Sequence, residues 1–234
     1  MGKNLIQQAR GKGTPRYRAP SFNYFGAAKI NFKQESAKVV DLVFCRGHSA
    51  PLAKLQFPNK EEGLIIASDG MKVGNIIYFG QHAQPLTGNT LLLKDIPEGS
   101  LVYNIEGIPG DGGRYVRASG GFAKVSIKTE NQVMIIFPSK KQKTFHPLCK
   151  ATMGIAAGGG RKEKPIMKAG NMYHRMRARN KRYPEISGSA QNAVDHPMGN
   201  KRTSRKSKAK PVSRNAPPGR KVGYIAARRT GQKK

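Results

Sequence analysis

The sequence predicts an all-β body of two small antiparallel barrels, flanked by long basic irregular N- and C-terminal extensions. Short apolar runs rich in Val, Ile, Tyr and Phe fill the middle of the chain, and Gly- and Pro-containing turns separate them. Hydrophobic residues make up 37% of the 234 residues, below the roughly 45–50% of typical globular domains. Part of the chain therefore cannot contribute to a core.

The first element is a basic N-terminal extension over residues 1–33, which contains seven Lys or Arg residues and no acid. It lacks the apolar run of a signal peptide, and Ile6 stands where an N-myristoylation motif requires Ser or Thr. The sequence shows neither a hydrophobic span nor a basic amphipathic helix. We therefore expect an intracellular protein without a membrane partner.

The two barrels are predicted from eight short runs between residues 37 and 138, which have the length and composition of strands. The runs are VVDLVF, LIIA, NIIYF, TLLL, LVYNI, YVRA, AKVSIK and VMIIF. In AKVSIK, strict alternation predicts that Val125 and Ile127 share one buried face. The turn-rich segment KDIPEG separates the barrels, which places the first domain at 34–96 and the second at 97–172.

The last element is a basic C-terminal extension over residues 173–234, which has too few hydrophobic residues to form its own core. The segment NMYHRMRARNKRYP, residues 171–184, could form a short helix, which its charge would leave solvated unless phosphates surrounded it. The segment KRTSRKSKAKP, residues 201–211, contains no large hydrophobic residue and is expected to be disordered in the free protein.

The charge of the chain lies mainly at its two ends. Residues 34–159 carry only +4 of the formal net charge of +30, and the flanks carry the other +26. Such a chain requires a polyanionic partner. The basic residues of the flanks alternate with Gly, Pro, Tyr and His, which allow close approach to a phosphate backbone or stack on bases. Nucleic acid is therefore the favoured partner.

Two cysteine–histidine pairs suggest a zinc site as an alternative. Cys45 and His48 form the motif CRGH, and His146 and Cys149 form HPLC, so four potential ligands are present. The two pairs belong to different predicted barrels, and their spacing matches no compact zinc finger. We therefore favour one buried thiol in each barrel and two surface histidines.

The pair Asp195-His196, within NAVDHPMGNKR, suggests acid–base catalysis. An enzyme would also need a third participant in a closed pocket, whereas the neighbours here are turn formers. The sequence contains no phosphate-binding G-x-x-x-x-G-K-[ST] loop and no nucleophile elbow, and GIPGDGGRY lacks the third glycine of the dinucleotide fingerprint. We expect GIPGDGGRY to be a turn whose backbone approaches a ligand. The chain is predicted not to be an enzyme.

Six ordered segments resemble successive landmarks of the universal ribosomal protein L2 family of the large subunit, in its archaeal and eukaryotic form. They extend from residue 11 to residue 231, and six motifs in one order are a specific signal. The segments are GKGTPRYRAPS, HSAPLA, PGDGGRYVRASG, CKATMGIAAGGGR, NAVDHPMG and SRNAPPGRKVGYIAARRTG.

The resemblance implies an OB-fold barrel followed by an SH3-like barrel, with extensions that thread into ribosomal RNA. It implies a cytoplasmic, structural constituent of the large ribosomal subunit that binds large-subunit rRNA, supports subunit association and reaches towards the peptidyl-transferase region. The implied partners are large-subunit rRNA, neighbouring ribosomal proteins and the small subunit at an intersubunit bridge. No cofactor is implied beyond Mg²⁺ associated with bound rRNA. The alternative is a non-ribosomal, architectural nucleic-acid-binding protein with an OB-fold.

Motif match and charge together select the candidate RNA-binding residues, and within this set His196 matches the histidine of the family's D-H-P element. The candidates are Arg10, Arg16, Arg18, Arg114, Arg117, Arg161, His174, Arg177, Asn192, His196, Arg214, Arg220, Arg228 and Arg229. The segment PEISGSAQNAV departs from the family pattern, because it has Ser187 in place of an arginine and gains a carboxylate at Glu185.

Overall fold

The computed structural model describes residues 2–30, 32, 34–80, 83–200 and 210–228. The chain forms two compact units: unit 1 is Met1–Pro20 with Ile166–Lys234, and unit 2 is Ser21–Pro165. Of the segment expected to be disordered, residues 201–209 lie outside the described residues, as does Arg229. Among the helices of the described ranges, none has the length and apolar character needed to cross a bilayer.

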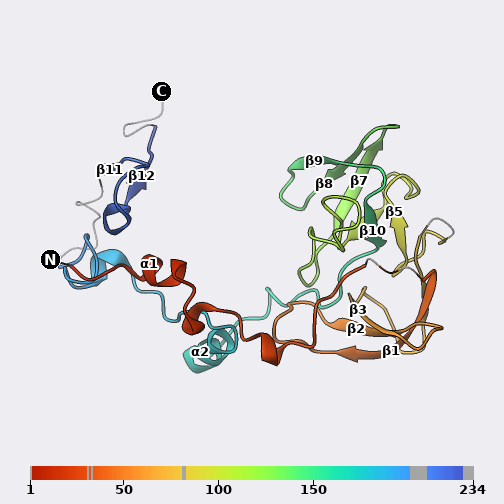
Figure 1. Ribbon diagram of the computed structural model, residues 1–234, viewed down its shortest axis with the longest axis horizontal. Helices are drawn as coiled ribbons and strands as arrows, with labels where there is room; N and C mark the ends of the chain where they lie inside the picture. The colour runs from red at the N-terminus through yellow and green to blue at the C-terminus, as the bar shows by residue number, and fades with distance from the viewer. Residues whose placement is uncertain (1, 31, 33, 81–82, 201–209, 229–234) are drawn as a thin grey trace. The chain divides into compact units, whose positions relative to one another are not determined.

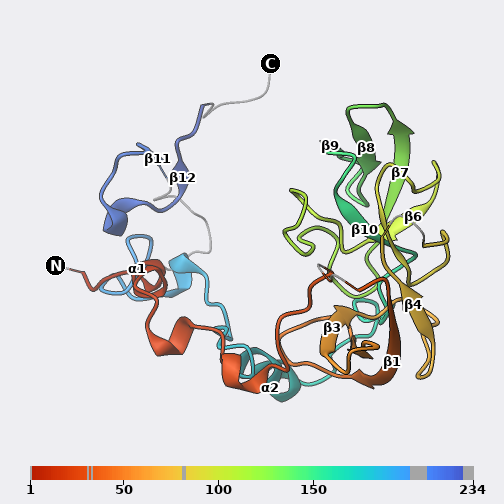
Figure 2. The ribbon, with the colours of Figure 1, turned by 45° about the vertical axis from the view of Figure 1, so that its right-hand side comes forward.

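Unit 2 contains two antiparallel sheets (Figures 1 and 2). A four-stranded sheet has the order β3-β2-β1-β4, and a six-stranded sheet has the order β5-β10-β6-β7-β8-β9. The strands are β1 Ser36–Val43, β2 Leu52–Gln56, β3 Glu62–Ile66, β4 Ile76–Tyr78, β5 Thr90–Leu92, β6 Leu101–Tyr103, β7 Ala123–Lys128, β8 Val133–Ile136, β9 Gln142–Phe145 and β10 Lys150–Met153. The all-β prediction, an OB-fold barrel followed by an SH3-like barrel, is confirmed.

Two of the strand predictions were wrong. The run YVRA is not a strand, because Val116 adopts a positive φ of 53° and only an isolated bridge joins Tyr115 to Ile105. In β7 the register shifts between Val125 and Ile127, so that Val125 is buried but Ile127 is 53% exposed. A β-bulge of this kind reverses the face on which later side chains lie, which is why strict alternation predicted Ile127 wrongly.

Each sheet has its own hydrophobic core, and a third cluster joins the two. The first core includes Val39, Leu55 and Ile65, and the second includes Val102 and Ile135. The third cluster combines residues of both barrels.

Tyr103 of β6 lies in this third cluster, fully buried, and its hydroxyl donates to the carbonyl oxygen of Ile66 at the end of β3 at 3.0 Å. Burial raises the pKa of Tyr103, so the phenol stays a hydrogen-bond donor. The two barrels are therefore packed against each other within unit 2. The boundaries at 33/34, 96/97 and 172/173 stay predictions, and β5 on the N-terminal side of residue 96 pairs with β10.

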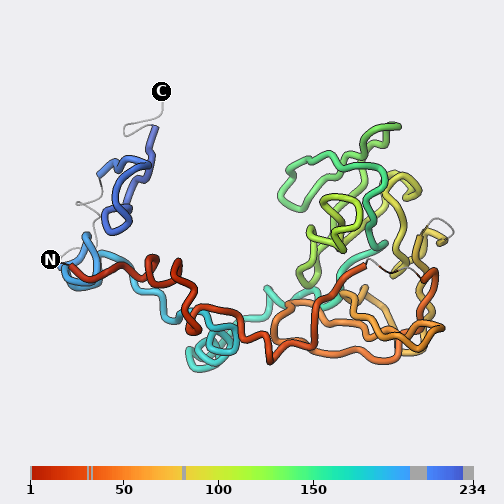
Figure 3. The backbone as a smooth tube through the Cα atoms, viewed as in Figure 1, coloured from red at the N-terminus to blue at the C-terminus, as the bar shows by residue number. Residues whose placement is uncertain are grey.

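Unit 1 contains little regular structure. Its helices are α1, Ile6–Gly11, and α2, Ala169–Arg177, and β11, Pro211–Val212, pairs in parallel with β12, Tyr224–Ile225. The short helix predicted within residues 171–184 is thus confirmed. In Figure 3 the N-terminal segment runs beside the segment that follows α2, and the backbone N–H of Lys3 donates to the carbonyl of Val194 at 2.8 Å.

Candidate nucleic-acid interface

The C-terminus of α2 is closed by a left-handed turn at Asn180. Asn180 has a φ of 49°, its N–H donates to the Arg177 carbonyl at 3.0 Å, and the Lys181 N–H donates to the Met176 carbonyl at 2.8 Å. These two bonds form a Schellman motif, in which asparagine is one of the few non-glycine residues that tolerate the left-handed position. The turn redirects the chain and fixes the side chain of Asn180.

The Asn180 side chain joins the two sequence segments of unit 1. Its Nδ2 donates to the carbonyl oxygens of Pro15 at 3.1 Å and Arg18 at 2.8 Å. These carbonyls belong to the first residue of the 3₁₀ turn Pro15–Tyr17 and to the residue that follows it, so one amide group holds the N-terminal segment beside the end of α2. The basic residues of both segments therefore belong to one surface.

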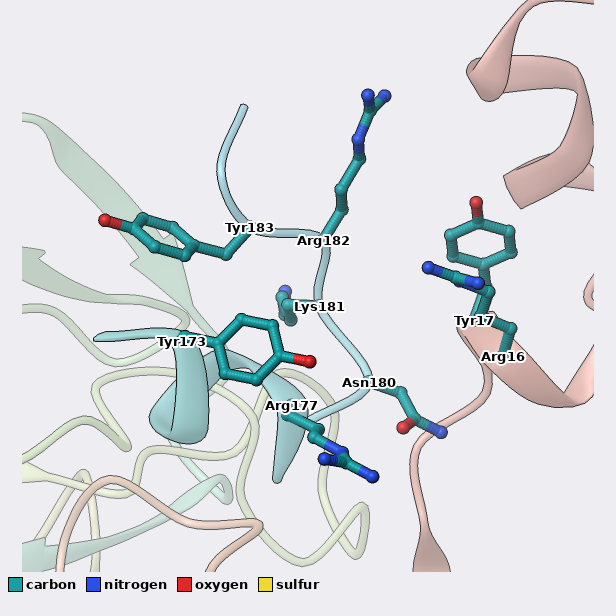
Figure 4. Close-up of a pocket in the computed structure, with 8 residues that line it drawn as sticks. All are labelled: Arg16, Tyr17, Tyr173, Arg177, Asn180, Lys181, Arg182 and Tyr183. Carbon is teal, nitrogen blue, oxygen red and sulfur yellow. The ribbon is translucent and has the colours of Figure 1, made fainter. Parts of the chain in front are cut away.

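This arrangement creates a cavity of about 360 Å³ within unit 1, which we call the tyrosine pocket (Figure 4). Its residues come from the Pro15–Tyr17 turn, from α2 and from the chain that follows, and they include three tyrosines and four cationic side chains but no carboxylate. The lining residues are Arg16, Tyr17, Tyr173, Arg177, Asn180, Lys181, Arg182 and Tyr183. Aromatic faces beside guanidinium groups can stack bases and bind phosphates.

His174 lies beside the tyrosine pocket without lining it. Its ring packs edge-on against Tyr173, with ring centroids 5.5 Å apart and an interplanar angle of 78°. Of the predicted site residues, Arg16 and Arg177 line the pocket, and Arg18 contributes a backbone carbonyl to its frame. The sequence prediction missed all three tyrosines as site residues, although their spacing among basic residues was the signal for this segment.

A second cavity of unit 1, about 390 Å³ in volume, contains His196, and we call it the histidine pocket. Arg182 lines both pockets. The lining residues are Leu5, Ile6, Gln7, Arg10, Arg182, Glu185, Ile186, Ser187, Gly188, Gln191, Asp195 and His196. Arg10 and His196, two predicted site residues far apart in sequence, therefore line one pocket.

The loop around His196 is held by its own backbone. The N–H groups of Asp195 and His196 donate to the Asn192 carbonyl at 3.0 and 3.1 Å, while the Asn192 side chain is exposed. Gly199 is buried so closely against the carbonyls of Gln191 and Asn192 that a Cβ atom would overlap both. This close approach leaves no room for a side chain at position 199.

The imidazole of His196 has a defined protonation pattern. Its Nδ1 accepts the N–H of Met198 at 3.1 Å, so the neutral ring carries its proton on Nε2. Burial lowers the pKa of His196, which favours this neutral form. The Asp195 carboxylate instead lies 3.8 Å from Lys3 Nζ. The His196 ring therefore has an N–H donor at Nε2, while the Asp195 carboxylate lies beside a lysine.

In unit 2 the loop GIPGDGGRY is organised by two carboxylates of the chain itself. The fully buried Glu106 accepts the N–H groups of Gly110, Gly112 and Lys150 at 3.3, 3.0 and 2.8 Å. These bonds satisfy a buried charge that would otherwise be costly.

Asp111 completes the same loop by accepting the N–H groups of Gly107, Ile108 and Gly113 at 2.8, 3.2 and 3.0 Å. Burial by itself raises the pKa of Asp111, but these three donors and Arg114 outweigh it, and the pKa lies below its usual value. The backbone N–H groups of this turn, whose backbone was expected to approach a ligand, therefore donate to carboxylates of the chain itself.

The three predicted arginines of unit 2 differ in their surroundings. Arg114 is exposed, with its Nε 3.8 Å from Asp111. Arg117 is partly buried, and its guanidinium donates to the carbonyls of Gly113 at 2.9 Å and Ala28 at 2.6 Å. Arg161 Nε donates to Ser119 Oγ at 2.8 Å. Arg117 therefore braces the fold, whereas Arg114 presents its charge to solvent.

Three landmark motifs meet around Ser119. The Ser119 N–H donates to Ser49 Oγ at 3.2 Å, and the N–H of Gly120 donates to the Ala156 carbonyl at 2.9 Å. A Cβ on Gly120 would lie 2.8 Å from Gly159 Cα. The segments HSAPLA, VRASG and AAGGGR thus form one glycine-dependent junction that carries Arg161.

The remaining predicted residues lie in the last part of unit 1. Arg214 and Arg220 are exposed in the loop between β11 and β12, and Arg220 ends the 3₁₀ turn Pro218–Arg220. Arg228 is exposed beyond β12. The structure does not bring these three residues to either pocket.

Both cysteines are fully buried, Cys45 in the third cluster and Cys149 in the core of the second barrel. Burial, followed by the nearby Glu106 carboxylate, raises the pKa of Cys149 to about 11, so this thiol is protonated at neutral pH. His48 Nδ1 lies 3.1 Å from Cys45 Sγ, and His146 is exposed. Among the described residues, no three potential ligands gather at one point.

The comparisons with known proteins agree with the order of the motifs. The family model described as "Ribosomal Proteins L2, C-terminal domain" matches residues 86–216. The chain is 49% identical to a protein named large ribosomal subunit protein uL2 from Archaeoglobus fulgidus, over 99% of both chains. It is 47% and 48% identical to proteins of the same name from Methanococcus aeolicus and Methanococcus maripaludis (strain C5), over 100% of each chain.

Proposed function

Because the chain belongs to the ribosomal protein L2 family, we propose that it is a structural component of the large ribosomal subunit that binds large-subunit rRNA. Relatives that match over whole chains at close to half identity support a cytoplasmic, ribosomal role in translation. Its partners are rRNA and neighbouring ribosomal proteins. In the finer role that the family supports, the chain aids subunit association at an intersubunit bridge, and its His196 loop reaches towards the peptidyl-transferase region.

The observation that best supports RNA binding is the tyrosine pocket. Four cationic groups surround three aromatic rings without a carboxylate to neutralise them. Phosphates would neutralise these charges, and bases would stack on the accessible faces of the rings. The unit that contains this pocket, Met1–Pro20 with Ile166–Lys234, carries 24 of the 43 Lys and Arg residues but only two of the 13 acids.

We further propose that the chain has no catalytic role and needs no cofactor of its own, apart from Mg²⁺ held by the bound rRNA. His196 offers one N–H donor, and its neighbouring carboxylate lies near a lysine and not on the ring. General acid–base catalysis requires a base that is oriented by a hydrogen-bonded partner and aimed at a reacting group. The loop supports docking better than proton transfer.

The test is the incorporation of tagged protein into ribosomes, followed by sucrose-gradient fractionation at high salt. The wild-type protein is expected to sediment with large subunits, and Tyr173→Ala is expected to reduce its occupancy there. Tyr78→Ala in unit 2 is the matched control, because Tyr173 and Tyr78 are 46% and 47% exposed. A wild-type profile confined to free or DNA-bound fractions would contradict the proposal and favour the non-ribosomal alternative.

A further inference from the structure

The two pockets of unit 1 differ in charge, although Arg182 lines both of them. The tyrosine pocket contains no acid, whereas the histidine pocket contains Glu185 and Asp195 together with Arg10 and Arg182. Asp195 lies 3.8 Å from Lys3 Nζ, and within the described ranges the Glu185 carboxylate has no hydrogen-bond or ion-pair partner. The histidine pocket therefore offers a solvent-exposed carboxylate, Glu185, beside the donor groups of Arg10, Arg182 and His196.

Phosphate does not suit the histidine pocket, because two carboxylates would repel its charge. A neutral planar group that offers donors to a carboxylate and acceptors to cationic side chains suits it better. RNA contains such groups in its unstacked bases, which proteins recognise through their Watson–Crick and Hoogsteen edges. The pocket volume of about 390 Å³ lies within the usual range of small-molecule sites.

Among the four bases, guanine matches these groups best. Its N1–H and 2-amino group are adjacent donors, and a carboxylate can accept both at once. Its O6 and N7 are acceptors on the neighbouring edge, which arginine recognises with two parallel bonds. Adenine, cytosine and uracil do not present two adjacent donors on a ring edge beside two such acceptors.

We propose that the histidine pocket binds one unstacked guanine of the bound RNA, and that Glu185 accepts its N1–H and 2-amino groups. Arg10, Arg182 and the Nε2–H of His196 supply donors for O6 and N7. Because Arg182 lines both pockets, the strand that stacks in the tyrosine pocket continues into the histidine pocket. This inference rests on the proposed RNA-binding function and adds base specificity to it.

The unusual segment 184–194 gains a role from this proposal. The resemblance to the family implies that a carboxylate is gained at Glu185 and an arginine is replaced at Ser187, and both residues line the histidine pocket. An arginine at position 187 would place a cation near the Glu185 carboxylate, which would then pair with the arginine and not with the base. The serine leaves Glu185 available to the ligand.

The experiment measures the affinity of the full-length protein for fluorescent oligouridine RNAs that carry one central guanosine, inosine or adenosine. Inosine differs from guanosine only by lacking the 2-amino group. Wild-type protein is expected to bind the guanosine strand about tenfold more tightly than the inosine strand, the range of a good bidentate contact. Glu185→Gln is expected to bring this ratio close to one, since the amide has a single acceptor oxygen.

Glu163→Gln is the matched control, because it makes the same charge change at an exposed position of unit 2 and should keep the ratio. Equal binding of all three strands by the wild type, or an unchanged ratio in Glu185→Gln, would overturn the guanine proposal and leave RNA binding intact. If the wild type bound neither these strands nor large-subunit rRNA, both proposals would be overturned.

Discussion

The two units of the chain contain opposite balances of apolar burial and charge. Unit 2 carries a net charge of +8 and contains all three hydrophobic clusters, whereas unit 1 carries +22 and, among its described hydrophobic residues, buries Leu5 and Met198. Burial of apolar surface is the dominant favourable term in folding. We therefore expect unit 2 to be stable alone and unit 1 to need the counter-charges of RNA for its segments to pack stably.

The arginines show the same difference at the level of single side chains. In unit 2 Arg117 donates to two backbone carbonyls, and burial lowers its pKa while Asp111 partly opposes that change. In unit 1 Arg16 and Arg177 line a pocket that lacks carboxylates. A basic residue in a polyanion-binding protein can thus either stabilise the fold or bind the ligand, and composition alone does not distinguish the two roles.

The largest expected effect comes from a core substitution in unit 2. Leu55 is fully buried, so Leu55→Ala should lower the free energy of unfolding by about 2–5 kcal/mol. Met198→Ala in unit 1 should change the same transition by less than about 0.5 kcal/mol. Urea unfolding followed by circular dichroism measures both. Equal shifts for the two variants would show that the units unfold as one.

A smaller effect is expected from the buried carboxylate that supports the glycine loop. Glu106→Gln replaces one acceptor oxygen by a donor and leaves at least one backbone N–H without a partner, at a cost of about 1–3 kcal/mol. The same unfolding measurement applies, with the exposed Glu130→Gln as control. If both variants unfold at the wild-type urea concentration, Glu106 does not organise the loop.

Two arginine substitutions test the distinction between arginines that stabilise the fold and arginines that bind RNA. Arg117→Lys removes the planar fork that reaches two carbonyls, so it should destabilise unit 2 by about 1–2 kcal/mol. Arg177→Lys should leave the unfolding midpoint unchanged and weaken RNA binding in a filter assay. Loss of stability in Arg177→Lys, or none in Arg117→Lys, would reverse the assignment.

The smallest effect concerns the pH dependence of the His196 loop. The folded chain lowers the pKa of His196, so its stabilisation is complete above the ordinary value of 6.5 and is lost as pH falls through the lower folded value. Protonated Nδ1 cannot accept the Met198 N–H, and exchange of that amide should accelerate at acid pH.

NMR titration of the imidazole, together with amide exchange at Met198, measures this change. His196→Asn offers a non-titrating acceptor in an equivalent turn and should abolish the pH dependence. An apparent pKa at or above 6.5 in the folded chain would contradict the buried, neutral ring.

The two cores could be predicted because apolar runs of strand length that are rich in β-branched residues are typical of buried strands. Runs such as VMIIF and LIIA contain β8 and most of β3. The polar strand β9, QKTF, has three exposed residues and gives no such signal. Ile127 was predicted wrongly because a bulge is a property of strand pairing and leaves no trace in the alternation of one strand.

The candidate site was only partly predictable. Charge and aromatic spacing identified the segment 171–184, and motif order identified His196. The tyrosine pocket depends on Asn180 bonding to Pro15, 165 residues away, and local patterns carry no information on such a contact. The stabilising role of Arg117 could not be predicted from the sequence either, because its partners are backbone carbonyls, which every residue has.

Hydrogen–deuterium exchange of the full-length chain, with and without large-subunit rRNA, tests the central claim that unit 2 folds alone and unit 1 orders on RNA. Amides of β1, β2, β7 and β8 should be protected in both samples. Amides of residues 173–183 and 191–200 should be weakly protected in the free chain and should gain protection when RNA is added. Equal protection of these segments in both samples, or a gain confined to unit 2, would contradict the account.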